Sequence, residues 1–212
     1  MGNSQTQQER YQTLSGDLVQ EYTELTPFTR HEINIFYRDF QKLNPNQRVN
    51  PRLDRSFAAR PEDVAKLPIL KCNPFKDRIL QVFSNQNSLV SFDDFLDLMT
   101  VFHPRTCRTV KLCHAFCIYD FDNDGFLGLD DLKRVIKRMT GGELDAEGTS
   151  IAQKTGNWFY MFNDSDIHDA AKRLLSELDL DRSNRISLEE FEYFITKCPD
   201  FVPLFSTRQK TR

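Results

Sequence analysis

A twelve-residue acidic segment at residues 120–131, DFDNDGFLGLDD, constrains the fold of this chain more than any other feature. Aspartates stand at its positions 1, 3 and 5, and a glycine stands at position 6. This spacing matches the calcium-binding loop of an EF-hand, in which carboxylates converge on one ion and the glycine permits a sharp turn. Apolar residues at helical spacing flank the segment on both sides, and a merely solvated acidic turn would leave them unexplained. We therefore predict a helix–loop–helix unit that binds Ca²⁺.

The EF-hand frame assigns a ligand to most positions of this 120–131 loop. The predicted ligands are the backbone carbonyl of Phe126 and the side chains of Asp120, Asp122, Asp124 and Asp131. A water molecule is expected to bridge from Gly128 at position 9. Leu127 at position 8 is the apolar residue expected to pair with a partner loop through a short strand.

A second segment in the same frame, DLDRSNRISLEE at residues 179–190, predicts a second ion site. Its predicted ligands are the backbone carbonyl of Arg185 and the side chains of Asp179, Asp181, Ser183 and Glu190. Asn184 replaces the usual glycine at position 6. Asparagine adopts left-handed backbone conformations more readily than most residues, so the turn is expected to form.

The two loops are expected to differ in ion preference. Asp131 closes the 120–131 loop with a side chain one methylene shorter than the usual glutamate, which makes bidentate closure harder. Lower coordination suits the smaller octahedral ion, so we predict that Mg²⁺ competes there at rest. The 179–190 loop keeps Glu190 but has only three ligand carboxylates, with Arg182 and Arg185 nearby. We predict moderate calcium affinity and a response to rising Ca²⁺ at this loop.

Apolar stripes with helical spacing recur in three helix–loop–helix copies from Pro74 onward. Together with an earlier helix pair that completes the first lobe, they predict an all-α fold of four EF-hand units in two lobes, with short β pairing between loops. The segment beginning at Ser84 keeps the frame but lacks early aspartates, so we interpret it as an inactive loop retained for packing. An earlier helix is expected to start near Thr29, because Thr29 and Glu32 have the spacing of a capping box. The helix pair over residues 29–66 has no recognisable calcium loop.

Composition excludes several classes of protein. The chain has 28 Lys and Arg against 31 Asp and Glu, so it lacks the basic excess of a nucleic-acid binder. It has no apolar run near the roughly 20 residues that span a bilayer, and no secretory signal. The sequence shows no nucleophile–base pair and no phosphate-binding loop, so we do not expect an enzyme. The five cysteines are interpreted as reduced thiols that pack in the core rather than as zinc ligands.

The N-terminal residues MGNSQT fit the acceptor pattern for myristate on Gly2. A single myristoyl chain gives only marginal, reversible membrane binding, and Arg10 is the one basic residue among the first 25. We therefore expect a cytoplasmic protein, peripheral at the plasma membrane, that reaches the inner leaflet through myristate and needs a second contact with a membrane-resident protein.

Several segments together resemble the calcium- and integrin-binding protein family. They are the MGNSQT start, TPFTRHEI at 26–33, NPFKDRI at 73–79, FDDFLDLM at 92–99, YDFDNDG at 119–125 and PDF at 199–201. The resemblance implies a non-enzymatic adaptor that holds an amphipathic helix of a membrane protein in an apolar groove. The partners it implies are integrin α cytoplasmic tails or, for the hearing-linked subgroup, cytoplasmic segments of transmembrane channel-like mechanotransduction proteins.

We expect the following domain plan. An N-terminal arm spans residues 1–25, an N-terminal lobe with two degenerate EF-hands spans 26–103, a C-terminal lobe with two functional EF-hands spans 104–200, and a tail spans 201–212. Residues 141–163 are interpreted as an insertion in the C-terminal lobe. Its aromatic run at 158–162 either packs on its own lobe or extends a partner surface.

We expect the partner groove to be lined by apolar residues of the predicted helices: Phe95, Leu98, Met99, Phe102, Leu112, Phe116, Val135, Ile136, Met139, Phe191, Phe194 and Ile195. The tail residues Phe201, Leu204 and Phe205 have similar spacing and could occupy this groove until displaced. Two alternatives stay open. One is a regulator of a cytosolic enzyme, similar to the phosphatase regulatory B subunit or the neuronal calcium sensors, and the other is a simple calcium buffer.

Overall fold

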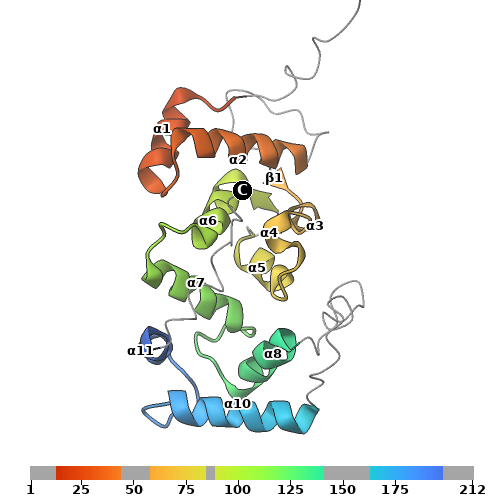
Figure 1. Ribbon diagram of the computed structural model, residues 1–212, viewed down its shortest axis with the longest axis vertical. Helices are drawn as coiled ribbons and strands as arrows, with labels where there is room; N and C mark the ends of the chain where they lie inside the picture. Colours follow the sequence, from red (N-terminus) through yellow and green to blue (C-terminus); the bar gives the residue numbers. More distant parts are fainter. Residues whose placement is uncertain (1–12, 44–57, 85–88, 141–162, 198–212) are drawn as a thin grey trace, which may run out of the picture. The chain divides into compact units, whose positions relative to one another are not determined.

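The computed structural model describes residues 13–43, 58–84, 89–140 and 163–197 (Figure 1). The chain divides into two compact units. Of the described residues, 13–43, 58–71, 79–84 and 89–106 belong to the first unit, and 72–78, 107–140 and 163–197 belong to the second. The regular structure of these ranges is helical apart from two short strands and one isolated bridge, which confirms the predicted all-α fold.

Helix α1 (Gly16–Leu25) lies in the stretch for which the sequence shows only weak periodicity. Ser15 caps its N-terminus by accepting a hydrogen bond from the Leu18 N–H at 3.4 Å. The helix contacts α2 and buries Val19 and Tyr22, and the Tyr22 hydroxyl donates to Asp93 Oδ1 at 2.7 Å. Two buried residues in ten are too few to give a clear helical pattern, so the packing of α1 becomes visible only in the structure.

Helix α2 (Arg30–Leu43) begins where the capping box predicts. The Thr29 N–H donates to Glu32 Oε2 at 2.8 Å, and the Glu32 N–H donates back to Thr29 Oγ1 at 3.3 Å. The predicted apolar face is buried, with Ile33 and Phe40 at 0% exposure. These side chains meet an aromatic core in which the Phe40 ring lies 5.0 Å from Phe95.

The rest of the first unit forms around two short strands. Helices α3 (Pro61–Val64) and α4 (Pro68–Lys71) follow β1 (Ala58–Ala59), and α6 (Phe92–Phe102) follows β2 (Val90–Ser91). The strands pair antiparallel, with Ala59 opposite Val90. The Asp94 carboxylate accepts hydrogen bonds from the backbone and hydroxyl of Ser91 and thereby caps α6. This acidic residue thus stabilises a helix end in the segment predicted to be an inactive loop.

The second unit contains the first turn of α5 (Lys76–Val82) and four longer helices. These are α7 (Arg108–Tyr119), α8 (Leu129–Met139), α10 (Asp164–Leu178) and α11 (Leu188–Lys197). Helix α7 contacts α8 and α11, and α10 contacts the same two helices. The four helices therefore form a closed ring, and the Phe191 ring of α11 lies 5.6 Å from the Phe116 ring of α7.

A single antiparallel bridge joins the two acidic loops of this ring. The Leu127 N–H donates to the Ile186 carbonyl at 2.9 Å, and the Ile186 N–H donates back at 3.0 Å. Both side chains are buried, at 1% and 0% exposure. The bridge confirms the pairing between loops that was predicted from Leu127 at position 8.

The core role predicted for the cysteines is wrong for those that the structure describes. Cys72, Cys107 and Cys117 are exposed, and Cys113 is half-buried. Cys117 is one helical turn from Cys113 and follows Phe116, which faces the core, so it occupies the solvent side of α7.

Some predicted features lie outside the described residues. They are Gly2, the aromatic run at 158–162 with nearly all of the 141–163 insertion, and the tail at 201–212. Among the helices that are described, none is long and apolar enough to cross a membrane.

We predict that Ile186→Ala destabilises the second unit by about 2–4 kcal/mol, because it removes buried methyl groups and leaves a cavity under the bridge. Urea unfolding in the presence of Ca²⁺ measures the change. Leu180→Ala, at a side chain that is 60% exposed, is the control and should stay within about 0.5 kcal/mol of the parent. Equal losses in the two variants would contradict a structural role for the bridge.

Candidate metal centres

The 120–131 loop lies between the end of α7 and the start of α8. Asp120 is the C-terminal cap of α7, and its N–H donates to the Phe116 carbonyl at 2.9 Å. Asp131 is the third residue of α8, and its Oδ2 accepts a hydrogen bond from the Gly128 N–H at 3.0 Å. The first and last predicted ligands are thus fixed by the helix ends that flank the loop.

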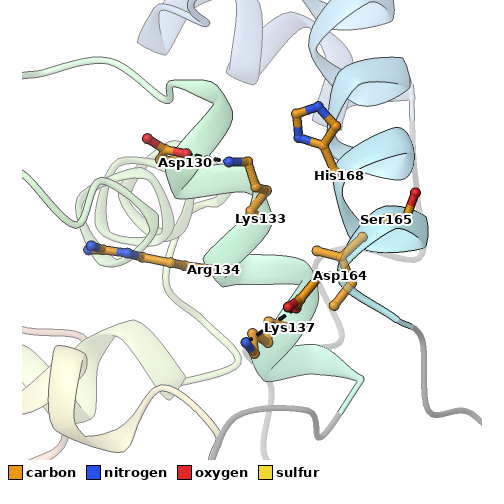
Figure 2. A pocket seen from close by; sticks show the side chains of 8 residues that line it. Asp130, Lys133, Arg134, Lys137, Asp164, Ser165 and His168 are labelled. Carbon is orange, nitrogen blue, oxygen red and sulfur yellow. Dashed lines mark hydrogen bonds and ion pairs between the residues drawn. The ribbon is translucent and has the colours of Figure 1, made fainter.

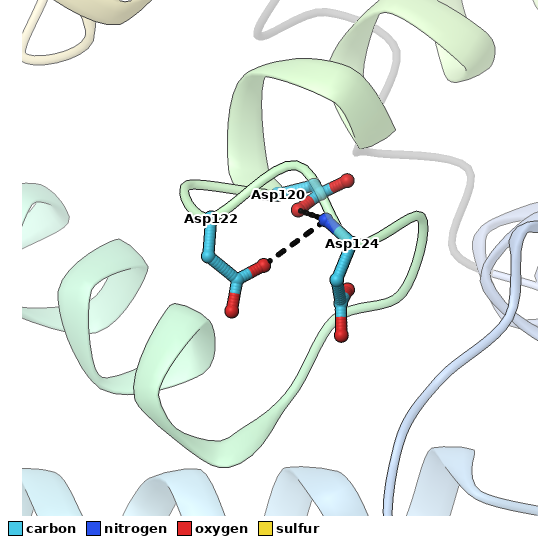
Figure 3. Close-up of side chains that lie close together, drawn as sticks. All are labelled: Asp120, Asp122 and Asp124. Atoms are coloured by element: carbon cyan, nitrogen blue, oxygen red, sulfur yellow. Dashed lines mark hydrogen bonds between the residues drawn. The ribbon is translucent and has the colours of Figure 1, made fainter.

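Hydrogen bonds inside the loop bring three carboxylates together (Figure 3). Asp120 accepts from the N–H groups of Asp124 at 3.2 Å and Gly125 at 3.0 Å, and Asp122 also accepts from the Asp124 N–H at 3.2 Å. As a result, Asp120, Asp122 and Asp124 each offer an oxygen within 4.8 Å of the others. This is the convergence that the spacing of the sequence predicts.

Asp131 is held slightly apart from these three carboxylates. Its Oδ1 accepts from the Phe121 N–H at 3.0 Å, and its Oδ2 caps α8. Burial raises the pKa of this carboxyl, the hydrogen bonds from Gly128 and Phe121 oppose the rise, and the charges of Asp122 and Asp120 add to it. Burial is thus the largest cause of the raised pKa, and a cation bound at the loop would act against it.

The 179–190 loop repeats this arrangement between α10 and α11. Asp179 accepts from the N–H groups of Ser183 at 2.9 Å and Asn184 at 2.8 Å, as Asp120 does in the other loop. Asp179, Asp181 and Glu190 each offer an oxygen within 4.8 Å of the others. The Ser183 hydroxyl donates to the Arg185 carbonyl at 3.0 Å, so two further predicted ligands also lie side by side.

Glu190 closes the 179–190 loop more completely than Asp131 closes its own. Its Oε1 accepts from the Leu180 N–H at 2.7 Å, and its Oε2 accepts from the Ser187 N–H at 2.9 Å. Burial by itself would raise the pKa of Glu190, but the hydrogen bonds from Ser187, Leu180 and Asp181 outweigh it and lower the pKa. The longer side chain thus reaches the other carboxylates and still caps α11.

Both loops use left-handed backbone at positions 4 and 6. The φ angles are 59° and 84° at Asn123 and Gly125, and 62° and 63° at Arg182 and Asn184. The prediction that Asn184 can replace glycine at position 6 is therefore confirmed. A β-carbon makes this conformation costly for most residues, which is why glycine or asparagine is favoured there.

The residues present fit a hard divalent cation at each loop. Three clustered carboxylates would repel one another in the absence of a positive charge, and oxygen donors at this spacing suit Ca²⁺. Arg185 adds a contact between the loops, because its guanidinium lies 3.7 Å from the centroid of the Phe126 ring. Phe126 and Arg185 each stand at position 7 of their own loop, where the backbone carbonyl is a predicted ligand.

The predicted groove residues divide into two groups by burial. Eight of them are buried in the cores of their units: Phe95, Leu98, Phe102, Leu112, Phe116, Val135, Phe191 and Ile195. Met99, Ile136 and Phe194 are half-buried, and Met139 is 55% exposed. The buried group thus belongs to the hydrophobic cores of the two units, and the second group reaches the surface of its own unit.

A hollow of about 670 Å³ between α8 and α10 is lined mostly by charged and polar side chains, unlike the predicted apolar groove (Figure 2). Lys133 pairs with Asp130 at 2.5 Å and Lys137 with Asp164 at 3.6 Å along its wall. Among the described residues that line it, only Ile167 carries an apolar side chain. This hollow therefore does not have the lining of a groove that binds an apolar helix face.

The sequence did not predict that a residue outside both loops would contact the 120–131 loop. Arg78 of α5 is 3% exposed and donates a hydrogen bond to Asn123 Oδ1 at 2.6 Å. The NPFKDRI segment marked this region, but nothing in the spacing of the sequence connects residue 78 to a loop more than 40 residues later.

Comparison with known proteins agrees with this geometry. A model of the EF-hand domain pair matches residues 109–196, a range that holds both loops and all but the two end residues of the four-helix ring. The second unit is thus a pair of EF-hands, and its acidic clusters indicate calcium binding.

The relatives extend over nearly the whole chain. Calcium and integrin-binding family member 2 of Drosophila melanogaster is 32% identical over 200 residues, which cover 92% of this chain and 96% of the relative. Calcium and integrin-binding family member 3 of Homo sapiens is 33% identical over 215 residues, covering 98% of this chain and 100% of the relative. The human member 2 is 28% identical over 214 residues. The chain belongs to the calcium and integrin-binding family.

We predict that Asn184→Ala weakens Ca²⁺ binding at the 179–190 loop roughly tenfold, because alanine at φ 63° costs about 1–2 kcal/mol. Asn184→Gly, which adopts this angle freely, should stay within about threefold of the parent. Isothermal titration calorimetry measures both affinities. Unchanged binding in the alanine variant would show that position 6 does not limit the loop.

Proposed function

We propose that this protein is a Ca²⁺- and Mg²⁺-binding adaptor that holds an amphipathic helix from the cytoplasmic part of a membrane protein. The observation that carries the proposal is the coupling of two carboxylate clusters to one ring of helices through the Leu127–Ile186 bridge. Ion binding at either loop acts on the helices that flank it. Because α8 and α11 follow the loops directly, their apolar residues respond to the same event.

Apolar residues at the surface of the second unit support a partner site. Met139 on α8 and Tyr193 on α11 are 55% and 51% exposed. Ile136, three residues before Met139, and Phe194, which follows Tyr193, are half-buried. An ion buffer has no need of such residues, whereas an adaptor uses them to bury the apolar face of a helix. The relatives are named for integrin binding, so an integrin α tail is one candidate partner. A cytoplasmic segment of a transmembrane channel-like protein is the other.

Membrane recruitment in this proposal uses two contacts. Myristate on Gly2 supplies weak affinity for the inner leaflet of the plasma membrane, and the partner protein supplies the rest. The net charge of −3 argues against attraction to anionic lipids by the whole chain. The adaptor is therefore expected to accumulate only at membranes that contain its partner.

The two loops are proposed to have different roles. Asp131 is one methylene shorter than the usual glutamate, and it is not part of the cluster in which Asp120, Asp122 and Asp124 offer oxygens within 4.8 Å of one another, so it offers one oxygen to an ion more readily than two. Mg²⁺ accepts this lower coordination, whereas Ca²⁺ prefers a bidentate closing carboxylate. Glu190 can supply both oxygens. We assign resting Mg²⁺ to the 120–131 loop and the response to Ca²⁺ to the 179–190 loop.

The partner site is tested with Met139→Glu. A buried charge in place of an apolar contact should weaken binding of a labelled integrin α tail peptide by more than tenfold, measured by fluorescence anisotropy with Ca²⁺ present. Leu25→Glu, at a residue that is 74% exposed in the first unit, is the control and should bind as the parent does. Equal affinity of all three proteins would contradict the proposed groove, and a channel-segment peptide tested in parallel identifies the preferred partner class.

The ion assignment is tested with Asp131→Glu. The added methylene should permit bidentate closure and raise Ca²⁺ affinity at the 120–131 loop several-fold, while Mg²⁺ affinity stays constant or falls. Calorimetric titrations with each ion, repeated on Glu190→Gln to silence the other loop, separate the two sites. An equal response of both loops to Mg²⁺ would refute the division of roles.

A further inference from the structure

We propose that Arg78 and Asp77, in the first turn of α5, are positioning residues of the 120–131 metal loop, which they brace from outside the EF-hand. The inference rests on the proposed ion binding of this loop. Figure 1 shows α5 as a separate element, and its first turn belongs to the same compact unit as the loop.

The Arg78 side chain contacts the loop through its terminal nitrogen Nη2. This nitrogen donates to the Cys117 carbonyl at 3.0 Å, to Asn123 Oδ1 at 2.6 Å and to the Asp120 carbonyl. It carries two hydrogens, so at least one of them is shared between two acceptors. The residue is 3% exposed, and a buried guanidinium in this position is costly unless its hydrogen bonds are made.

The three acceptors share a structural role. The Cys117 carbonyl belongs to the last turn of α7, where carbonyls lack partners within the helix and a cation interacts favourably with the helix dipole. The Asp120 carbonyl marks position 1 of the loop, and the Asn123 side chain marks position 4. Arg78 therefore ties the end of the entering helix to both ends of the first turn of the loop.

This tie determines where the clustered carboxylates lie. Asn123 has a φ of 59°, and the N–H of the next residue, Asp124, donates to Asp120 and Asp122. Fixing positions 1 and 4 thus fixes the turn that carries all three carboxylates. A loop that already has its binding shape loses less conformational freedom when the ion arrives.

Asp77 extends the brace to the helix that leaves the loop. Its two carboxylate oxygens accept from Arg138 Nη1 at 2.8 Å and Nη2 at 2.9 Å, a bidentate pair at the end of α8. The Arg138 guanidinium also lies 4.8 Å from the ring centroid of Phe121, at position 2 of the loop. Neighbouring residues of α5 therefore hold both the entering and the leaving helix of the same EF-hand.

The 179–190 loop provides an internal comparison. Its position 4 is Arg182, which carries no hydrogen-bond acceptor on its side chain and so cannot be held by an arginine in this way. Loss of the brace should therefore weaken the 120–131 loop selectively. The positive charge of Arg78 acts in the opposite direction, because it repels a cation, so removing the charge alone would tighten binding.

The experiment titrates the full chain with Ca²⁺ and follows the backbone amide resonances of Gly125 and Asn184, which report the two loops separately. Arg78→Met should weaken binding at Gly125 roughly tenfold, and the loss there should exceed the loss at Asn184 at least threefold. Arg78→Lys keeps the charge but cannot span the three acceptors, so it should also weaken binding at Gly125. Arg173→Met, which removes an exposed arginine from α10, is the control and should leave both loops unchanged.

Asn123→Gly provides a second test that keeps Arg78 in place. It removes one acceptor while glycine retains the left-handed backbone, and it should weaken binding at Gly125 roughly threefold. This variant decides the outcome if thermal unfolding shows that Arg78→Met does not fold. Folded Arg78→Met with unchanged or tighter binding at Gly125, equal losses at both loops, or an unaffected Asn123→Gly would overturn the inference. If the parent chain binds no ion at either loop, the proposed function itself fails.

Discussion

Two backbone hydrogen bonds between Leu127 and Ile186 are the contact on which the second unit depends. They join the loops at position 8, beside the carbonyls at position 7 that are predicted ligands. Each loop in turn connects two helices, so the bridge determines how the ends of four helices meet. Because both side chains are almost fully buried, the bridge also belongs to the hydrophobic core. Ion coordination and core packing are therefore parts of one cooperative structure.

The clustered carboxylates repel one another, and hydrogen bonds from backbone N–H groups reduce this repulsion only in part. N–H groups of positions 5 and 6 donate to the position 1 aspartate in both loops, which shapes each cluster before an ion binds. These hydrogen bonds offset part of the repulsion among the carboxylates. At Asp131, burial is the main cause of the raised pKa, and the charges of Asp122 and Asp120 add to it. A divalent cation supplies the missing charge, so ion binding and stability of the folded state are linked.

The sequence predicts the parts of this protein that depend on local spacing. The two acidic loops, the capping box at Thr29, the buried face of α2 and the pairing of Leu127 follow from residue type and position, and the structure confirms them. Helix α1 was missed because only Val19 and Tyr22 are buried on it. The contacts of Arg78 with the loop were missed for a different reason: its acceptors lie 39 to 45 residues later, and no periodicity connects such distant positions.

The carboxylates that end the two loops serve the helices as well as the ion. Asp131 caps α8 through Gly128, and Glu190 caps α11 through Ser187. A replacement that removes the side-chain oxygens at either position, such as alanine, would remove a helix cap together with a predicted ligand. In a genetic screen, an alanine allele at codon 131 or 190 would consequently lower the cellular abundance of the protein as well as its ion response.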